Sequence, residues 1–182
     1  MKTIIIIVVI ILLIAIYAGM YNSLVKYRNR AQEFSSQIDV QLKRRTDLIP
    51  NLVETVKGYA KHEKETLANV IQLRNNVNTA DSLQDKVEAD SALSGALRQV
   101  FALAENYPDL KANQEFSQLM EELSNTENKV SYARQAYNSQ VQAYDTAIQT
   151  FPRNIIAGIH GFKEMNFLQI PDADKAAPKV KF

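Results

Sequence analysis

The feature that most constrains this chain is an uncharged apolar run near its start. No Asp, Glu, Lys or Arg lies within Ile4–Met20. A membrane-spanning helix needs about 20 apolar residues, within a range of about 17–25. Tyr17 and Tyr21 stand at the end of the run, where interfacial aromatic residues are expected. The sequence therefore predicts a transmembrane anchor over residues 1–21, which contacts the lipid bilayer through residues 4–20.

A cleaved signal peptide is the alternative interpretation of the same run. Such a peptide needs small residues at positions −3 and −1 before the cut. Cleavage after Ala18 places Ile16 at −3, and cleavage after Gly19 places Tyr17 there. Neither site fits, so we expect an uncleaved anchor and a single-pass protein.

The charges that flank the anchor bear on the orientation of the rest of the chain. Lys26, Arg28 and Arg30 come after the run, whereas Lys2 precedes it. Loops rich in Lys and Arg stay in the cytoplasm, which favours a cytoplasmic domain. A Lys directly before an apolar run is also typical of a signal anchor that exports the domain after it. Both orientations therefore stay open, and the flanking charges favour the cytoplasmic one.

The composition excludes several classes of function. Lys and Arg number 21 against 20 Asp and Glu, so the chain lacks the basic field that nucleic-acid binding requires. The chain has no Cys, which excludes disulfides, a thiolate nucleophile and a Cys-based zinc site. No phosphate-binding loop, nucleophile elbow or paired-carboxylate motif is present. We therefore predict no nucleic-acid partner, no enzymatic activity, no cofactor and no metal site.

Apolar residues spaced three and four apart predict long amphipathic helices after the anchor, and no period-2 stretch predicts a strand. The first helix is expected to continue from the anchor and to end near Arg45. At Pro50 either a second helix begins or one long helix kinks. A third helix is expected from about Ser82 to Asn106. The longest is expected from about Lys111 to Thr150.

Four such segments with short connections predict an all-α fold. In it the N-terminal transmembrane helix continues into an antiparallel four-helix bundle with long helices, over residues 22–168. Residues 169–182 are expected to form a flexible C-terminal tail. Phe151 is expected in the buried stripe of the last long helix, and Ile155–Ile159 is expected to form a short apolar turn.

A dense group of polar side chains surrounds Pro50. One interpretation is a contact with anionic lipid or with a protein partner. The other is a solvated helix end, where cations near the C-terminus are favoured by the helix dipole. The candidate partner-contact residues are Lys43, Arg44, Arg45, Asp47, Asn51 and Glu54.

Glu63 lies on the apolar stripe that begins at Pro50, so its carboxylate needs a partner. Pairing with Arg98 or Arg134 across the bundle would make a buried polar group or a ligand site, and an ordinary structural contact is the alternative. His62 and Glu63 are adjacent and lack the i, i+4 spacing of a helical metal site. His160 lacks the convergent ligands that a metal site needs.

Several sequence blocks after the anchor form a specific combination. They are Ser36–Arg45, Asp47–Glu54, Gly58–Ala60, His62–Glu63, Tyr107–Ala112, Glu122–Leu123, Thr126–Lys129, Tyr132–Asn138, Phe151–Pro152 and Asn154–Ala157. Together they resemble the LemA family of bacterial membrane-anchored proteins, over about residues 20–165. The chain departs from that family at His160-Gly161-Phe162, where Phe-Gly-Phe is usual.

The resemblance implies an N-terminally anchored helical protein with no established activity, cofactor or ligand. We predict a non-catalytic, single-pass protein of the bacterial cell membrane. Its bundle would act as a scaffold or interaction module for membrane-bound partners or for self-assembly. The alternative function is a membrane-anchored sensor domain that holds a small molecule between its helices.

Overall fold

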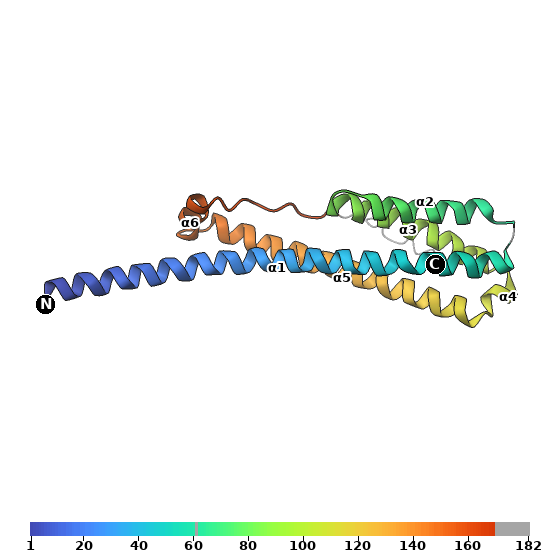
Figure 1. Cartoon of the computed structure of the whole chain (residues 1–182), viewed down its shortest axis with the longest axis horizontal. Coiled ribbons are helices and arrows are strands. Elements are labelled where there is room, and N and C mark those ends of the chain that lie inside the picture. Colours follow the sequence, from blue (N-terminus) through green and yellow to red (C-terminus); the bar gives the residue numbers. More distant parts are fainter. Residues whose placement is uncertain (61, 170–182) are drawn as a thin grey trace, which may run out of the picture. The chain divides into compact units, whose positions relative to one another are not determined.

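The computed structural model describes residues 1–60 and 62–169. These residues form helices and contain no strand, so the all-α prediction is confirmed (Figure 1). The predicted flexible tail lies outside the described residues, apart from Gln169. The helices are α1 (Lys2–Tyr59), α2 (Lys64–Thr79), α3 (Leu83–Ala104), α4 (Pro108–Lys111), α5 (Gln114–Gln149) and α6 (Arg153–His160).

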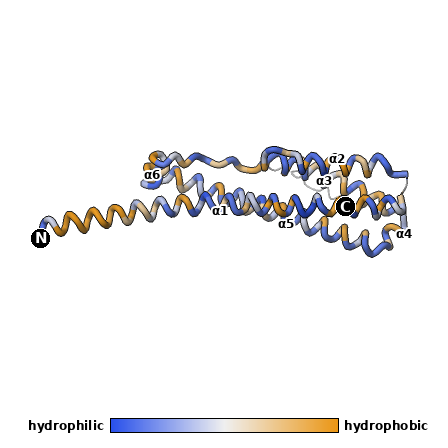
Figure 2. The backbone as a smooth tube through the Cα atoms, viewed as in Figure 1, coloured by the Kyte–Doolittle hydropathy of each residue, from blue (hydrophilic) through white to orange (hydrophobic). Residues whose placement is uncertain are grey.

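The N-terminal part of α1 is a bare apolar helix. Figure 2 shows it as a continuous apolar segment, and its large side chains from Ile4 to Ile16 are exposed. Among the described helices, α1 is the one that is long and apolar enough to cross a membrane. Contiguous apolar surface of this kind marks a contact with lipid or with another protein. The predicted long N-terminal apolar helix is therefore confirmed.

The described residues pack as two compact units. The first combines Met1–Ser35 with Gln135–Phe167, and the second combines Ser36–Arg134 with the segment that begins at Leu168. Both α1 and α5 contribute to each unit. The predicted domain limits after residues 21 and 168, and the four-helix arrangement, stay predictions.

Each unit has its own apolar core. In the second unit, α2 and α3 pack side by side as a helical hairpin (Figure 1). Its core takes residues at helical spacing from α1, α2, α3 and α5, among them Ile38, Ile49, Leu52, Val56, Val70, Leu93, Leu97 and Leu123. The core of the first unit is the cluster of Leu24, Tyr144, Ala147, Ile148, Ile156 and Ala157.

Helix α1 passes through Pro50 and does not end near Arg45, so that predicted boundary is wrong. Proline has no N–H, which leaves the Thr46 carbonyl oxygen without its helical donor. Arg74 of α2 supplies the replacement, because its Nε donates to the Thr46 oxygen at 2.9 Å. The Thr46 hydroxyl also lies 3.0 Å from Asn78 Oδ1. The long helix is thus completed at Pro50 by side chains of a neighbouring helix.

Other boundaries agree more closely with the sequence. Helix α3 begins after Ser82, whose hydroxyl accepts from the Asp85 N–H at 3.1 Å as an N-cap. The predicted longest helix, from about Lys111 to Thr150, corresponds to α5, and the single turn of α4 precedes it. Phe151 is 75% exposed, so its predicted burial is wrong. The predicted apolar turn at Ile155–Ile159 is instead part of α6.

Candidate functional sites

A buried arginine joins three helices of the second unit. Arg45 of α1 is 1% exposed. Its Nη1 donates to both carboxylate oxygens of Asp90 of α3, each at 2.8 Å. Its Nη2 donates to Glu127 Oε2 of α5 at 3.0 Å. A buried charge is costly without such partners, and charge-assisted hydrogen bonds are the strong ones. Arg45, Asp90 and Glu127, here called the Arg45 cluster, thereby connect α1, α3 and α5.

The two carboxylates of the Arg45 cluster differ in their surroundings. The Asp90 side chain is 8% exposed, whereas that of Glu127 is 45% exposed. Burial raises the pKa of the Asp90 carboxyl above its ordinary value, while the Arg45 guanidinium opposes the rise. The charge of Glu127 raises this pKa further, and that of Arg134 lowers it. Of the two carboxylates, Asp90 is therefore the one whose charged form depends on Arg45.

The burial of Arg45 removes it from the predicted set of partner contacts. Its guanidinium points into the core because Asp90 and Glu127 lie there, so a partner has no access to it. The other five predicted residues are all exposed. Asp47, Asn51 and Glu54 follow Lys43 and Arg44 at steps of three and four residues along α1, so the five residues share one face of the helix. With Val40 they form the surface that we call the α1 ridge: Val40, Lys43, Arg44, Asp47, Asn51 and Glu54.

The α1 ridge is mixed in charge and borders a hollow. Lys43 pairs with Asp47, and Glu54 accepts from Lys57 at 2.8 Å. Arg44 lies 4.0 Å from Glu122 of α5. Arg44 and Glu122 also line a polar hollow of about 510 Å³, whose other lining residues belong to α5. The ridge therefore offers both signs of charge beside a concave surface.

The structure places Glu63, Arg98 and Arg134 in different surroundings, and their pairing stays a prediction. Glu63 precedes α2, is only half-buried and accepts from the Tyr107 hydroxyl at 3.2 Å. Arg98 is exposed on α3. Arg134 acts electrostatically on Asp90. The buried carboxylate near an arginine is therefore Asp90, not Glu63.

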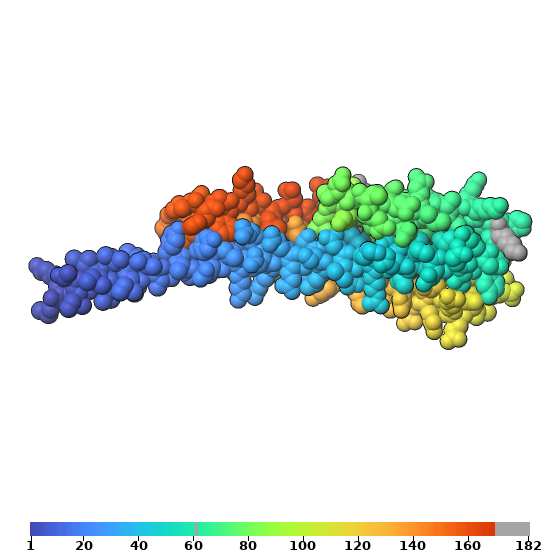
Figure 3. Space-filling view, viewed as in Figure 1, coloured from blue at the N-terminus to red at the C-terminus, as the bar shows by residue number. Residues whose placement is uncertain are grey.

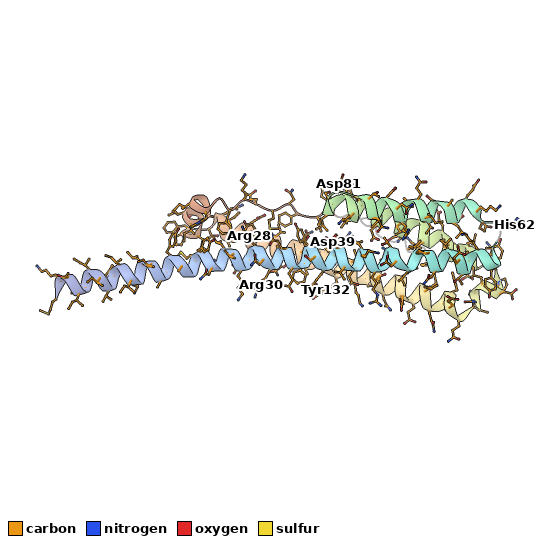
Figure 4. The ribbon with its side chains drawn as sticks, viewed as in Figure 1. Arg28, Arg30, Asp39, His62, Asp81 and Tyr132 are labelled. Atoms are coloured by element: carbon orange, nitrogen blue, oxygen red, sulfur yellow. The ribbon has the colours of Figure 1, made fainter. Side chains whose placement is uncertain are left out.

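A larger hollow of about 850 Å³ lies where α1 gives way to α2. Figure 4 shows His62 in the connection between these helices. Its lining combines basic side chains with small and aliphatic ones. The lining residues are Lys57, Ala60, His62, Lys64, Leu67, Ala68 and Ile71.

In the first unit, His160 lies against the anchor. Its Nε2 is 2.7 Å from the Tyr17 hydroxyl, and its ring centroid is 4.6 Å from that of Tyr21. Gly161 has a φ of 67°, a left-handed conformation that favours glycine at the end of a helix. The turn lets the Phe162 N–H donate to the Ala157 oxygen at 3.0 Å and brings the Phe162 ring to 5.8 Å from Tyr21. The segment where this chain departs from Phe-Gly-Phe thus packs on α1.

Comparison with known proteins decides the family. The sequence model that describes the LemA family matches residues 34–182 of this chain. This chain belongs to the LemA family. Protein LemA of Metamycoplasma hominis is 31% identical over 147 residues, which cover 78% of this chain and 65% of that protein.

The LemA-family chain is also similar to two magnetosome proteins. Magnetosome protein MamQ of Magnetospirillum gryphiswaldense is 23% identical over 182 residues, covering 81% of this chain and 64% of that protein. Magnetosome protein MamQ 2 of Paramagnetospirillum magneticum is 23% identical over 175 residues, covering 82% and 64%. The chain therefore spans slightly less than two thirds of the length of these relatives.

Sequence reasoning missed Asp90 and Glu127 as partners of Arg45. A signal for Asp90 was present, because it lies midway between Val87 and Leu93 on the buried face of α3. A carboxylate at such a position needs a buried cation. Glu127 carried no comparable signal, since its side chain is partly exposed.

Proposed function

We propose that this LemA-family chain is a non-catalytic, single-pass protein of the bacterial cell membrane. Its helical part acts as a scaffold or interaction module for a membrane-bound partner or for a second copy of the chain. The α1 ridge carries the proposal, because its exposed side chains stand on a helix whose opposite face is held by the Arg45 cluster. Side chains on a fixed helix lose less freedom when they bind, which favours association.

The chemistry of the α1 ridge favours a protein partner over lipid. Recognition of anionic lipid uses clusters of about 4–8 Lys and Arg. The ridge instead alternates Lys43 with Asp47 and adds the exposed aliphatic side chain of Val40. Mixed charges of this kind set register and choice of partner at protein interfaces.

A photo-crosslinking residue in place of Asn51 tests the proposal in native membranes. We expect a discrete adduct that disappears when Asp47→Lys is added. The matched control places the crosslinker at Gln72, an exposed residue of α2, and gives no such adduct. Two differently tagged copies of the chain distinguish self-assembly from a second protein. A folded chain that gives no adduct from either Val40 or Asn51 would contradict the proposed role.

We place the helical part on the cytoplasmic side, on the strength of Lys26, Arg28 and Arg30 after the anchor. Reporter fusions at the C-terminus test this orientation. Activity of a reporter that functions only in the cytoplasm supports this orientation, and activity of a reporter that functions only outside the cytoplasm reverses it.

A sensor domain is the second candidate function, and the hollow at the start of α2 favours it. Lys57, His62 and Lys64 line this hollow together with Leu67 and Ile71, which suits an organic anion with an apolar body. We expect naphthoate to raise the thermal midpoint of the chain in nanodiscs. The uncharged analogue naphthalenemethanol and the Lys64→Gln variant serve as controls. An equal shift with either control, or no shift with naphthoate, would exclude this site.

A further inference from the structure

Helix α6 and the residues before it present one apolar face that the described residues leave exposed. Ile156 and Ala157 pack into the core of the first unit. Phe151, Ile155 and Ile159 are 75%, 54% and 67% exposed. Within α6, Ile155 and Ile159 are four residues apart and therefore share one face of the helix. A short helix with one buried and one exposed apolar face needs a second apolar environment.

Contacts with α1 fix the level of α6 along the anchor. His160, the last residue of α6, contacts Tyr17 and Tyr21. These tyrosines stand at the end of the apolar run, at the position that aromatic residues take at a membrane–water boundary. Figure 3 shows α6 against α1 next to the part of the helix that no other element covers. The exposed face of α6 thus lies at the level where the exposed apolar surface of the anchor ends.

The groups around α6 match an interfacial position. Arg153 lies in its first turn and no acidic residue does. The Arg28 guanidinium lies 5.3 Å from the centre of the Phe162 ring, next to the turn that ends α6. Basic side chains beside aromatic and aliphatic ones are typical of helices that lie in the plane of a bilayer surface.

We propose that α6 is a second membrane contact. Phe151, Ile155 and Ile159 insert into the boundary between headgroups and acyl chains of the same bilayer that α1 crosses. Helices of this kind bury their apolar face about 5–10 Å into that boundary. Lipid is favoured over a second copy of the chain because a stable protein interface buries about 800 Å² per partner, far more than three side chains provide. The contact is independent of the α1 ridge and of its proposed partner.

The proposal is tested with single fluorophores, because the chain has no Trp. The full-length Ile159→Trp variant is reconstituted in vesicles of phosphatidylcholine and phosphatidylglycerol that carry bromine either near the headgroup end or near the terminus of the acyl chains. Tyr132→Trp is the control, since Tyr132 is an exposed residue of α5 in the second unit (Figure 4). We expect the Ile159→Trp indole to be quenched several-fold more than the control by the shallow bromines, and less by the deep ones. Iodide in the water should quench the control more strongly.

Phe151→Trp is a second reporter, since it replaces one aromatic residue with another and leaves the buried Ile156 and Ala157 untouched. Iodide quenching of both reporters at the level of the control, without bromine quenching, would overturn the proposal. Self-association is checked with Ile155→Cys, because the chain has no other thiol. A high yield of disulfide-linked dimer together with weak bromine quenching would assign the face to a second copy and would also overturn the membrane contact.

Discussion

The replacement Arg45→Met tests how strongly the Arg45 cluster holds the second unit together. Methionine keeps much of the aliphatic volume but removes the cation, which leaves the Asp90 carboxylate in the interior. Removal of one partner of a buried ion pair costs about 3–5 kcal/mol. The contact with the half-exposed Glu127 adds only about 0–1 kcal/mol, because water solvates that carboxylate. We expect a loss of about 3–5 kcal/mol, a large part of the roughly 5–15 kcal/mol of a typical domain.

The same variant should lose stability as the pH rises. Without the opposing guanidinium, burial raises the pKa of Asp90 further above its ordinary value of 3.8. The folded state then binds a proton more readily than the unfolded state, so the buried Asp90 carboxyl reduces the folding stability least at pH values below that ordinary pKa. Stability is lost as the pH rises through the raised pKa of the folded state. The double variant Arg45→Met/Asp90→Asn has no carboxyl to ionise at this position. We expect the single variant to match the double variant in acid and to be less stable at neutral pH.

Urea unfolding in nanodiscs, monitored by circular dichroism at several pH values, measures both effects. Arg45→Met/Asp90→Leu is a further control, because replacing a whole buried pair with apolar residues is often neutral or stabilising by about 1–4 kcal/mol. A loss below about 1 kcal/mol for Arg45→Met would indicate a hydrated Asp90 and refute the reasoning. Identical pH profiles for Arg45→Met and Arg45→Met/Asp90→Asn would do the same.

Three further predictions concern the backbone. Arg74→Met should destabilise the chain by about 1–3 kcal/mol, because the Thr46 oxygen loses its donor. The loss should be much smaller when Pro50→Ala restores the missing N–H, so a double-mutant cycle measured by urea unfolding should show coupling between the two positions. Additive effects would contradict the role of Arg74. Gly161→Ala should cost about 1–2 kcal/mol because of its positive φ, whereas the control Gly158→Ala, within a helix and with open space around it, should be neutral or stabilising in thermal unfolding. Ser82→Ala should cost about 1 kcal/mol through loss of the N-cap, whereas Ser82→Asn should retain most of the stability in the same assay.

Features set by neighbouring residues were predictable from the sequence. The long apolar N-terminal helix, the helical periodicity and the start of a helix near Ser82 depend on residues within a few turns of one another, and the structure contains all three. The position of α6 shows the limit of this reasoning. The end of the long helix was predicted near Thr150, but burial of one face of α6 depends on Leu24, which is far away in the sequence.

The same limit explains the errors around Pro50. Local rules ended the first helix near Arg45 and left either a second helix or one long kinked helix open at Pro50. The helix continues instead, and the Thr46 oxygen finds its donor in Arg74, 28 residues further on. Local rules also placed Arg45 on a charged surface. Its partners Asp90 and Glu127 lie 45 and 82 residues beyond it, so no local pattern identifies them. Pairing over such separations is a property of the packed helices.

Those separations also set an order of events during synthesis. A bacterial chain grows by about 5–20 residues per second, so Glu127, 82 residues after Arg45, emerges about 4–16 s later. During that interval the Arg45 guanidinium lacks its carboxylate from α5, whereas Asp90 of α3, 45 residues after Arg45, has already been made. The Arg45 cluster therefore closes late, because the helix that supplies its last member is the last of the three to be synthesised.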